Sequence, residues 1–248
     1  MVAIAVYGDS LIDESGADLR ASLRSLLPGW NIIIRSHGGA AQCDFHAQMV
    51  DDADHSNVRA AILAFSGNLF TSCAVSRPYP GSYASDAHWA ADLYGARGVP
   101  LAFVATPGRA GSTPAERIVP NVYRAVGTQR GIPVVESDDL FVDPATGRYE
   151  ITGPCLVGEC VDRIVIRSPD GGHLCPVPGS VPCAVYSSGV VRYSDGIVAM
   201  TGALLHVTSP PRHTLVPHDV VAHDDDHVTT NTSTTTTSTS TTTSTTVV

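Results

Sequence analysis

The sequence predicts an α/β fold, a three-layer α/β/α sandwich built on a five-stranded parallel sheet. Three observations lead to this prediction. Apolar runs alternate with helical patterns along most of the chain. The first run, Val2–Tyr7, is continuously apolar, as is typical of strands that are buried on both faces. A turn of small and polar residues, Gly8–Leu11, follows it directly, at the position where open α/β sheets place their ligand sites.

The elements follow in order along the chain. Strands are expected over residues 2–7, 30–35, 58–65, 101–106 and 132–136. Helices are expected from Glu14 to Leu27, over 85–97, from 113 onward and over 187–205. Residues 113–116 have the form of a capping box, but Pro120 lies too deep for a straight helix from that start, so we expect a kink or a later start.

Composition bounds the domain organisation and the partners. The chain has 248 residues, and we expect one domain over 1–206, a linker over 207–228 and a disordered Thr/Ser-rich tail over 229–248. The net charge is −9 and lysine is absent. No basic stripe appears, so nucleic-acid binding is not expected. No apolar run approaches about 20 residues, so no membrane span is expected. We expect a monomer.

The six cysteines form an even set in predicted loops and element ends, at positions 43, 73, 155, 160, 175 and 183. This distribution favours disulfides, an oxidising compartment and hence a secreted or cell-surface protein. Zinc ligation is the alternative, which the absence of a Cys-x-x-Cys pair disfavours. The first strand follows Met1 at once, with no signal peptide visible. A mis-started reading frame, or a domain cut from a longer protein, would reconcile the two observations.

Ser10 is the candidate nucleophile, since it stands in the turn that ends the first strand. A nucleophilic serine needs a histidine to accept its proton and a carboxylate to orient that histidine. Asp-x-x-His occurs three times, at Asp52–His55, Asp170–His173 and Asp224–His227. The second pair lies in a turn that Pro169 and two glycines enforce, between the last predicted strand and the last predicted helix. Asp170 and His173 are therefore the candidates. The first pair lies in a polar stretch between two predicted strands, for which a solvated helix end is favoured. The third pair lies in an acidic run for which a solvated segment is favoured over weak metal binding.

Over residues 1–206 the chain resembles the SGNH hydrolases, also called GDSL esterases. Four blocks in the family's order carry the resemblance: residues 8–11 (GDSL), 37–40 (HGGA), 65–68 (FSGN) and 170–173 (DGGH). The resemblance implies a flavodoxin-like SGNH fold with Ser10 as nucleophile and Asp170 and His173 completing the triad. It also implies oxyanion-hole donors from the backbone of Ser10 and of Gly38 or Gly39, and from the side chain of Asn68.

Two residues depart from the family's third block, Gly-x-Asn-Asp: Ser66 stands at the glycine position and Leu69 replaces the aspartate. The sequence around these blocks resembles the secreted or cell-surface branch of the family, which includes domains fused to membrane acyltransferases. Six cysteines permit fifteen pairings, and the sequence alone does not choose among them. Of these we expect Cys43–Cys73, which would tie the glycine loop to the asparagine loop beside the active site.

The expected activity is hydrolysis of a short-chain acyl ester, with acetyl on a carbohydrate preferred by resemblance and no metal or other cofactor. The residues leave three alternatives open. An O-acyltransferase would use the same residues with a sugar hydroxyl in place of water. The altered asparagine block could mark a catalytically dead cell-surface binding module. A disulfide-stapled structural domain carrying a stalk is the last alternative.

Overall fold

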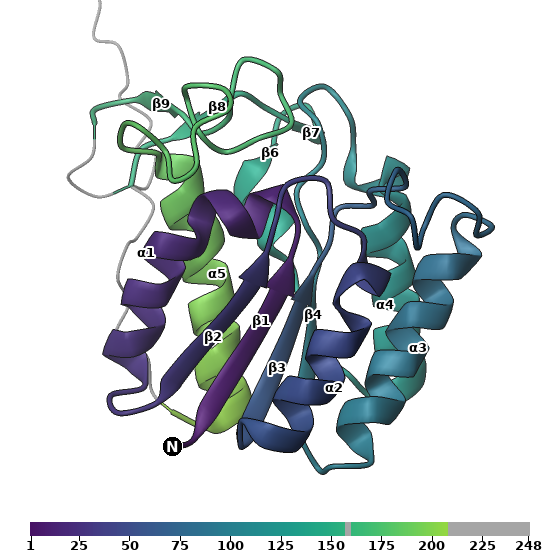
Figure 1. Cartoon of the computed structure of the whole chain (residues 1–248). Coiled ribbons are helices and arrows are strands. Elements are labelled where there is room, and N and C mark those ends of the chain that lie inside the picture. Colours follow the sequence, from purple (N-terminus) through teal and green to yellow (C-terminus); the bar gives the residue numbers. More distant parts are fainter. Residues whose placement is uncertain (157–159, 208–248) are drawn as a thin grey trace, which may run out of the picture. The chain divides into compact units, whose positions relative to one another are not determined.

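The predicted three-layer α/β/α architecture is confirmed in the computed structural model, which describes residues 1–156 and 160–207 (Figure 1). Five parallel strands form the central sheet in the order β2-β1-β3-β4-β5. The strands are β1 (Ala3–Gly8), β2 (Asn31–Ser36), β3 (Val58–Ala64), β4 (Leu101–Val104) and β5 (Val134–Val135).

Helices cover both faces of this sheet. On one face lie α1 (Ser10–Leu26) and α5 (Ser188–Leu205), and on the other lie α2 (His46–His55), α3 (Gly81–Gly95) and α4 (Ile118–Arg130) (Figure 1). Successive side chains of β1 point alternately into the two cores, one on each face of the sheet. Ala5 and Tyr7 pack with α2, α3 and α4, whereas Ile4 and Val6 pack with α1 and α5. Because both faces are buried, the strand is apolar throughout.

Several helix boundaries differ from the sequence expectation. Helix α1 begins at Ser10 rather than Glu14, because Asp9 caps it directly at the end of β1. Helix α4 starts late, at Ile118, which puts Pro120 in the first turn, where a missing N–H costs nothing. For helix α2 the sequence predicted only a solvated helix end near His55. The helix buries only Met49 and Asp52, so its sequence shows little apolar periodicity.

The segment between β5 and α5 carries two small antiparallel hairpins that the sequence did not predict. They are β6 (Val142–Asp143) with β7 (Arg148–Tyr149), and β8 (Thr152–Pro154) with β9 (Arg163–Val165). Strands of two or three residues are too short to show an alternation pattern. Short 3₁₀ turns, η1 (Gln42–Phe45), η2 (Pro114–Glu116) and η3 (Ser137–Phe141), complete the described elements.

All six cysteines form disulfides, so they are not available as zinc ligands. The expected Cys43–Cys73 bond is confirmed, and it joins η1 to the loop after β3. The other pairs are Cys155–Cys160 and Cys175–Cys183. Within the described ranges, no helix is long and apolar enough to cross a membrane. The Thr/Ser-rich tail and the Asp224–His227 pair lie outside the described residues.

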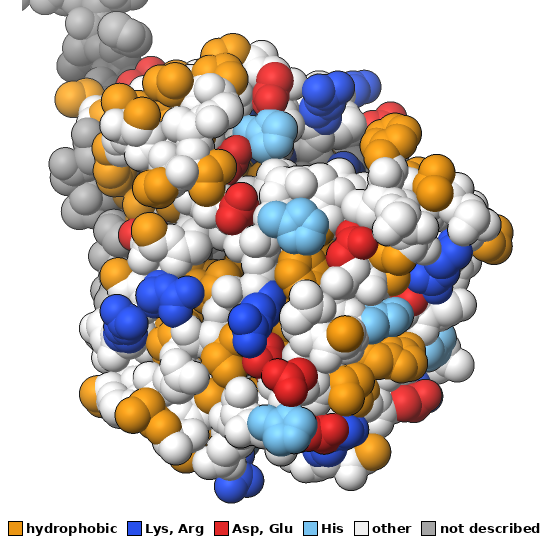
Figure 2. All heavy atoms as spheres, viewed as in Figure 1, with side chains coloured by type: hydrophobic (Ala, Val, Ile, Leu, Met, Phe, Trp, Pro, Cys, Tyr) orange, Lys and Arg blue, Asp and Glu red, His pale blue; other side chains and the backbone are white. Residues whose placement is uncertain are grey.

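Basic side chains lie singly or in small groups over the face of the molecule seen in Figure 2, among acidic and neutral ones. Several arginines of the described chain form ion pairs with carboxylates, as in Arg35–Asp52 and Arg97–Asp54. A continuous basic surface is what nucleic-acid binding requires, and this face does not present one.

Candidate active site

The carboxyl ends of the central strands meet around one open cavity. Gly8, the last residue of β1, pairs with Ser36 of β2 and with Ala64 of β3, which brings the loops after these strands together. The cavity has a volume of about 240 Å³. It is lined by Ser10, Leu11, Ser66, Gly67, Asn68, Pro107, Arg109, Arg117, Gly172 and His173. Three of the predicted site residues, Ser10, Asn68 and His173, thus share a cavity.

Gly8 allows the chain to turn from β1 directly into α1. A Cβ atom at this position would lie 2.2 Å from Cγ1 of Ile12 and 2.8 Å from the backbone oxygen of Ala64. With glycine there, α1 begins at Ser10, so the serine sits at the positive end of the helix dipole with its backbone N–H at the helix start. A helix N-terminus favours negative charge, such as the oxyanion of an acyl-transfer intermediate.

Asp9 is fully buried beneath the serine and organises the loop after β3. One carboxylate oxygen accepts hydrogen bonds from the backbone N–H and the hydroxyl of Ser66, both at 2.6 Å, and from Nδ2 of Asn68 at 3.2 Å. Its other oxygen accepts from the N–H of Leu11 at 3.2 Å. Burial raises the pKa of Asp9, while the hydrogen bonds from Ser66 act in the opposite direction. Ser66 therefore contributes two donors to this carboxylate, and a glycine at position 66 would contribute only its backbone N–H.

Asn68 joins two loops of the site. Its Nδ2 donates to Asp9 and, at 3.0 Å, to the backbone oxygen of Ala40, the residue that follows the predicted glycine pair. Both amide hydrogens thus have protein acceptors, and donation to a substrate oxygen requires one bond to be exchanged. Gly38 and Gly39 lie exposed on the loop after β2 and are not among the residues that line the cavity.

Asp170 and His173 form the predicted pair. Nδ1 of His173 lies 2.6 Å from Oδ2 of Asp170, and the other carboxylate oxygen accepts from the N–H groups of Gly172 and His173. Although burial acts to raise the pKa of Asp170, these hydrogen bonds hold it well below its usual range. Among the described residues no hydrogen bond joins Ser10 Oγ to the His173 ring, a gap that often closes only when substrate binds.

The Asp52–His55 pair does not form. Asp52 is buried, accepts from Tyr7 Oη at 2.9 Å and pairs with Arg35, whereas His55 contacts Asp51 on the exposed end of α2. The helix-end interpretation of this segment is therefore the right one.

Two buried charged residues that the sequence did not single out hold the histidine loop in place. Oε2 of Glu14 accepts from the N–H of Leu174 at 2.6 Å and of Cys175 at 3.3 Å, which ties α1 to the residues after His173. Arg167 is fully buried and donates to the backbone oxygens of Gly108 and Gly172, joining the loop after β4 to the same histidine loop. Burial lowers the pKa of Arg167 to about 10.

Signals for both residues were present in the sequence. Glu14 is an acidic residue one helical turn after Ser10, on the buried side of α1. Arg167 directly follows the apolar pair Val165-Ile166 and precedes the histidine loop. A charge in such a position is expected to have a specific partner.

Glu14 gives a pH-dependent prediction. Burial raises its pKa above the usual 4.5, so the folded protein holds this proton more strongly than the unfolded chain does. The stability that the neutral form contributes is present below about pH 4.5 and is lost as the pH rises through the folded-state pKa. Glutamine at position 14 does not titrate and keeps an acceptor oxygen. The free energy of unfolding of Glu14→Gln, relative to wild type, should therefore rise between about pH 4 and pH 7 in urea titrations. A constant or falling difference would contradict the raised pKa.

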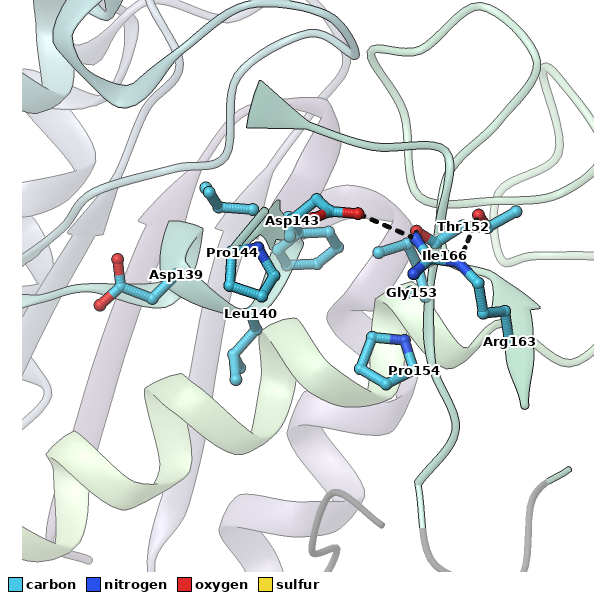
Figure 3. A pocket seen from close by; sticks show the side chains of 11 residues that line it. Asp139, Leu140, Asp143, Pro144, Thr152, Gly153, Pro154, Arg163 and Ile166 are labelled. Atoms are coloured by element: carbon cyan, nitrogen blue, oxygen red, sulfur yellow. Dashed lines mark hydrogen bonds and ion pairs between the residues drawn. The ribbon is translucent and has the colours of Figure 1, made fainter. Parts of the chain in front are cut away.

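A second cavity, of about 250 Å³, lies among η3 and the two hairpins (Figure 3). Its wall is mainly apolar, with Leu140 and Ile166 among the lining residues, and Arg163 is bonded there to Thr152 and Asp143. No histidine, serine or cysteine lines it. A serine and a histidine line the Ser10 cavity together, whereas this second cavity has neither.

Several solved structures share this architecture. A candidate SGNH hydrolase from Slackia heliotrinireducens superposes with a TM-score of 0.56 at 14% identity, over 81% of this chain and 99% of that one. The chain has the fold of the SGNH hydrolases. A candidate acylhydrolase from Bacteroides fragilis gives 0.54 at 13% identity over 82% and 86% of the two chains. The acetyl xylan esterase AlAXEase gives 0.54 at 12% identity over 80% and 98%.

Scans of protein-family models and of curated proteins gave no match. At identities this low, the structural likeness establishes the SGNH fold, and the activity has to be argued from the site itself.

Proposed function

We propose that the protein is a serine ester hydrolase that cleaves a short acyl ester, with O-acetyl on a carbohydrate as the preferred substrate class. The observation that carries the proposal is the Asp170–His173 hydrogen bond on a loop facing the cavity in which Ser10 begins α1. A serine, a histidine and an orienting carboxylate are the groups that acyl transfer through a covalent intermediate requires.

In the proposed reaction, His173 Nε2 accepts the Ser10 proton as Oγ attacks the acyl carbonyl. Asp170 fixes the ring through Nδ1 and stabilises the imidazolium. The N–H groups at the start of α1 and the Asn68 amide, with the Gly38–Gly39 loop as a further candidate donor, stabilise the oxyanion. His173 then returns the proton to the leaving alcohol, and water releases the acid from Ser10 by the same steps in reverse order.

The size of the cavity and the structural neighbours support a small acyl group. A volume of about 240 Å³ suits an acetyl group and part of its alcohol better than a long lipid chain. One neighbour is described as an acetyl xylan esterase. The three disulfides are compatible with a secreted or cell-surface location, which we include in the proposal.

Hydrolysis of p-nitrophenyl acetate and butyrate by the oxidised protein tests the proposal, with Ser10→Ala purified in parallel to control for contaminating esterases. We expect the wild type to release p-nitrophenol and to prefer acetate. A sugar alcohol added as acceptor separates the rival transferase, because acyl transfer would yield acetylated sugar in place of free acetate. Absence of both hydrolysis and transfer would refute an acyl-transfer enzyme and favour the binding module.

A further inference from the structure

The charged side chains that line the Ser10 cavity are arginines, although the protein as a whole is acidic, and the carboxylates of Asp9 and Asp170 are bonded to lining residues from behind. The ten lining residues of the cavity include Arg109 and Arg117 but no aspartate or glutamate. The whole chain, in contrast, carries 24 acidic and 15 basic residues. A low-dielectric cleft lined by charges of one sign concentrates ligands of the opposite sign.

Arg109 presents its guanidinium to this cavity without a protein partner. It is exposed, and within the described part of the chain no carboxylate or carbonyl accepts a hydrogen bond from its side chain. Many other arginines form ion pairs with carboxylates: Arg35, Arg77, Arg97, Arg124, Arg130 and Arg163. Arg117 lines the same cavity and is directed by bonds to Ser66 O at 3.3 Å and Thr106 Oγ1 at 3.5 Å.

The backbone that carries Arg109 is fixed against the histidine loop. The N–H of Ala110 donates to Gly171 O at 2.9 Å, and a Cβ atom on Gly171 would lie 3.0 Å from the Ala110 side chain. Arg167 bonds to Gly108 O and Gly172 O on either side of this contact. The backbones of Arg109 and His173 are therefore held on two segments that are bonded to each other, which places both side chains within one cavity for a ligand that bridges them.

We propose that Arg109 binds a carboxylate on the alcohol part of the ester, so that the substrate is an O-acetylated acidic molecule such as an acidic sugar. This inference rests on the proposed function. An acetyl group carries no ionisable group, so the carboxylate that Arg109 would bind has to lie on the alcohol part of the ester. The planar guanidinium matches a carboxylate in a two-point hydrogen bond, and Arg117 adds to the attractive field.

The test compares 4-acetoxybenzoate with its neutral analogue 4-acetoxybenzamide, each kcat/KM being divided by the rate of hydroxide-catalysed hydrolysis. We expect the wild type to prefer the anion by about tenfold, and Arg109→Gln to lose about that factor in the anion/neutral ratio. Arg109→Lys should keep part of this preference for the anion, and 0.5 M NaCl should reduce the preference of the wild type.

Arg59→Gln is the matched control, because Arg59 is exposed near the amino end of β3, away from the cavity. The anion/neutral ratio of Arg59→Gln should equal that of the wild type. An unchanged ratio in Arg109→Gln would overturn the proposal.

A binding measurement separates failure of this inference from failure of the proposed function. Calorimetric titration with 4-acetamidobenzoate and 4-acetamidobenzamide needs no turnover. Tighter binding of the carboxylate, lost in Arg109→Gln but not in Arg59→Gln, would support the anion site even if no ester were hydrolysed. Equal binding of the two analogues to the wild type would refute it even if esters were hydrolysed.

Discussion

Substitution of Ser10 by alanine is expected to lower kcat for p-nitrophenyl acetate by about 10⁴-fold or more. The serine supplies the nucleophile, and without Oγ no acyl-enzyme forms at the start of α1. The cavity and the N–H groups at the helix start remain, so a small residual acceleration over buffer should persist. Steady-state kinetics and the circular dichroism spectrum of the variant together separate lost chemistry from lost folding.

The His173→Ala variant should lose activity to a similar extent, and the Ser10→Ala/His173→Ala double variant should be no worse than either single variant. Groups that act as one unit are not additive in their effects on rate. The matched control is His55→Ala, since His55 is an exposed histidine that contacts a carboxylate, Asp51, on α2. Additive losses in the double variant, or a His173→Ala protein within tenfold of wild type, would contradict the proposed roles.

The second large effect is expected on stability, from Gly8→Ala. The added Cβ would lie 2.2 Å from Cγ1 of Ile12 and 2.8 Å from the Ala64 carbonyl oxygen, and a backbone oxygen at a strand end cannot move aside cheaply. We expect a loss of about 2–3 kcal/mol in the free energy of unfolding, a typical cost of overpacking. Urea denaturation monitored by circular dichroism measures it.

Gly16→Ala is the control for Gly8→Ala because it adds the same methyl group to the same region of the chain. Gly16 lies inside α1, and a Cβ atom added there would lie 4.0 Å from Cγ2 of Ile34, its nearest neighbour. Alanine there should stabilise the protein by about 0.5–1 kcal/mol through its helix propensity. Equal effects of the two substitutions would mean that the turn between β1 and α1 tolerates a side chain at position 8.

Much of the fold could be predicted from local patterns. Three elements can each be recognised from a short stretch of sequence: the buried run of β1, the leucine spacing of α1 and the glycine-rich turn around His173. Since parallel strands place their carboxyl ends at one edge, these patterns also account for the position of Ser10 after β1 near Asn68 after β3. The Asp-x-x-His spacing in a turn enforced by Pro169 and two glycines predicted the pairing of Asp170 with His173.

The rest depends on contacts between residues far apart in the chain. Asp9 meets Ser66 across 57 residues, and Glu14 meets Leu174 across 160. No local pattern encodes such partners, so the role of Ser66 as an additional donor could be read only from the structure. The same holds for the role proposed for Arg109, which rests on the loop bonds that bring it into one cavity with His173 and on the absence of a described acceptor for its side chain.

The central claim is that Ser10 is a nucleophile activated by His173, and covalent labelling tests it most directly. The oxidised protein is treated with a fluorophosphonate, and the modified peptide is mapped by mass spectrometry. We predict one stoichiometric adduct on Ser10, with labelling slowed by at least 10³-fold in His173→Ala but not in His55→Ala. An unlabelled Ser10 in folded, disulfide-bonded protein, or an adduct at another residue, would contradict the account.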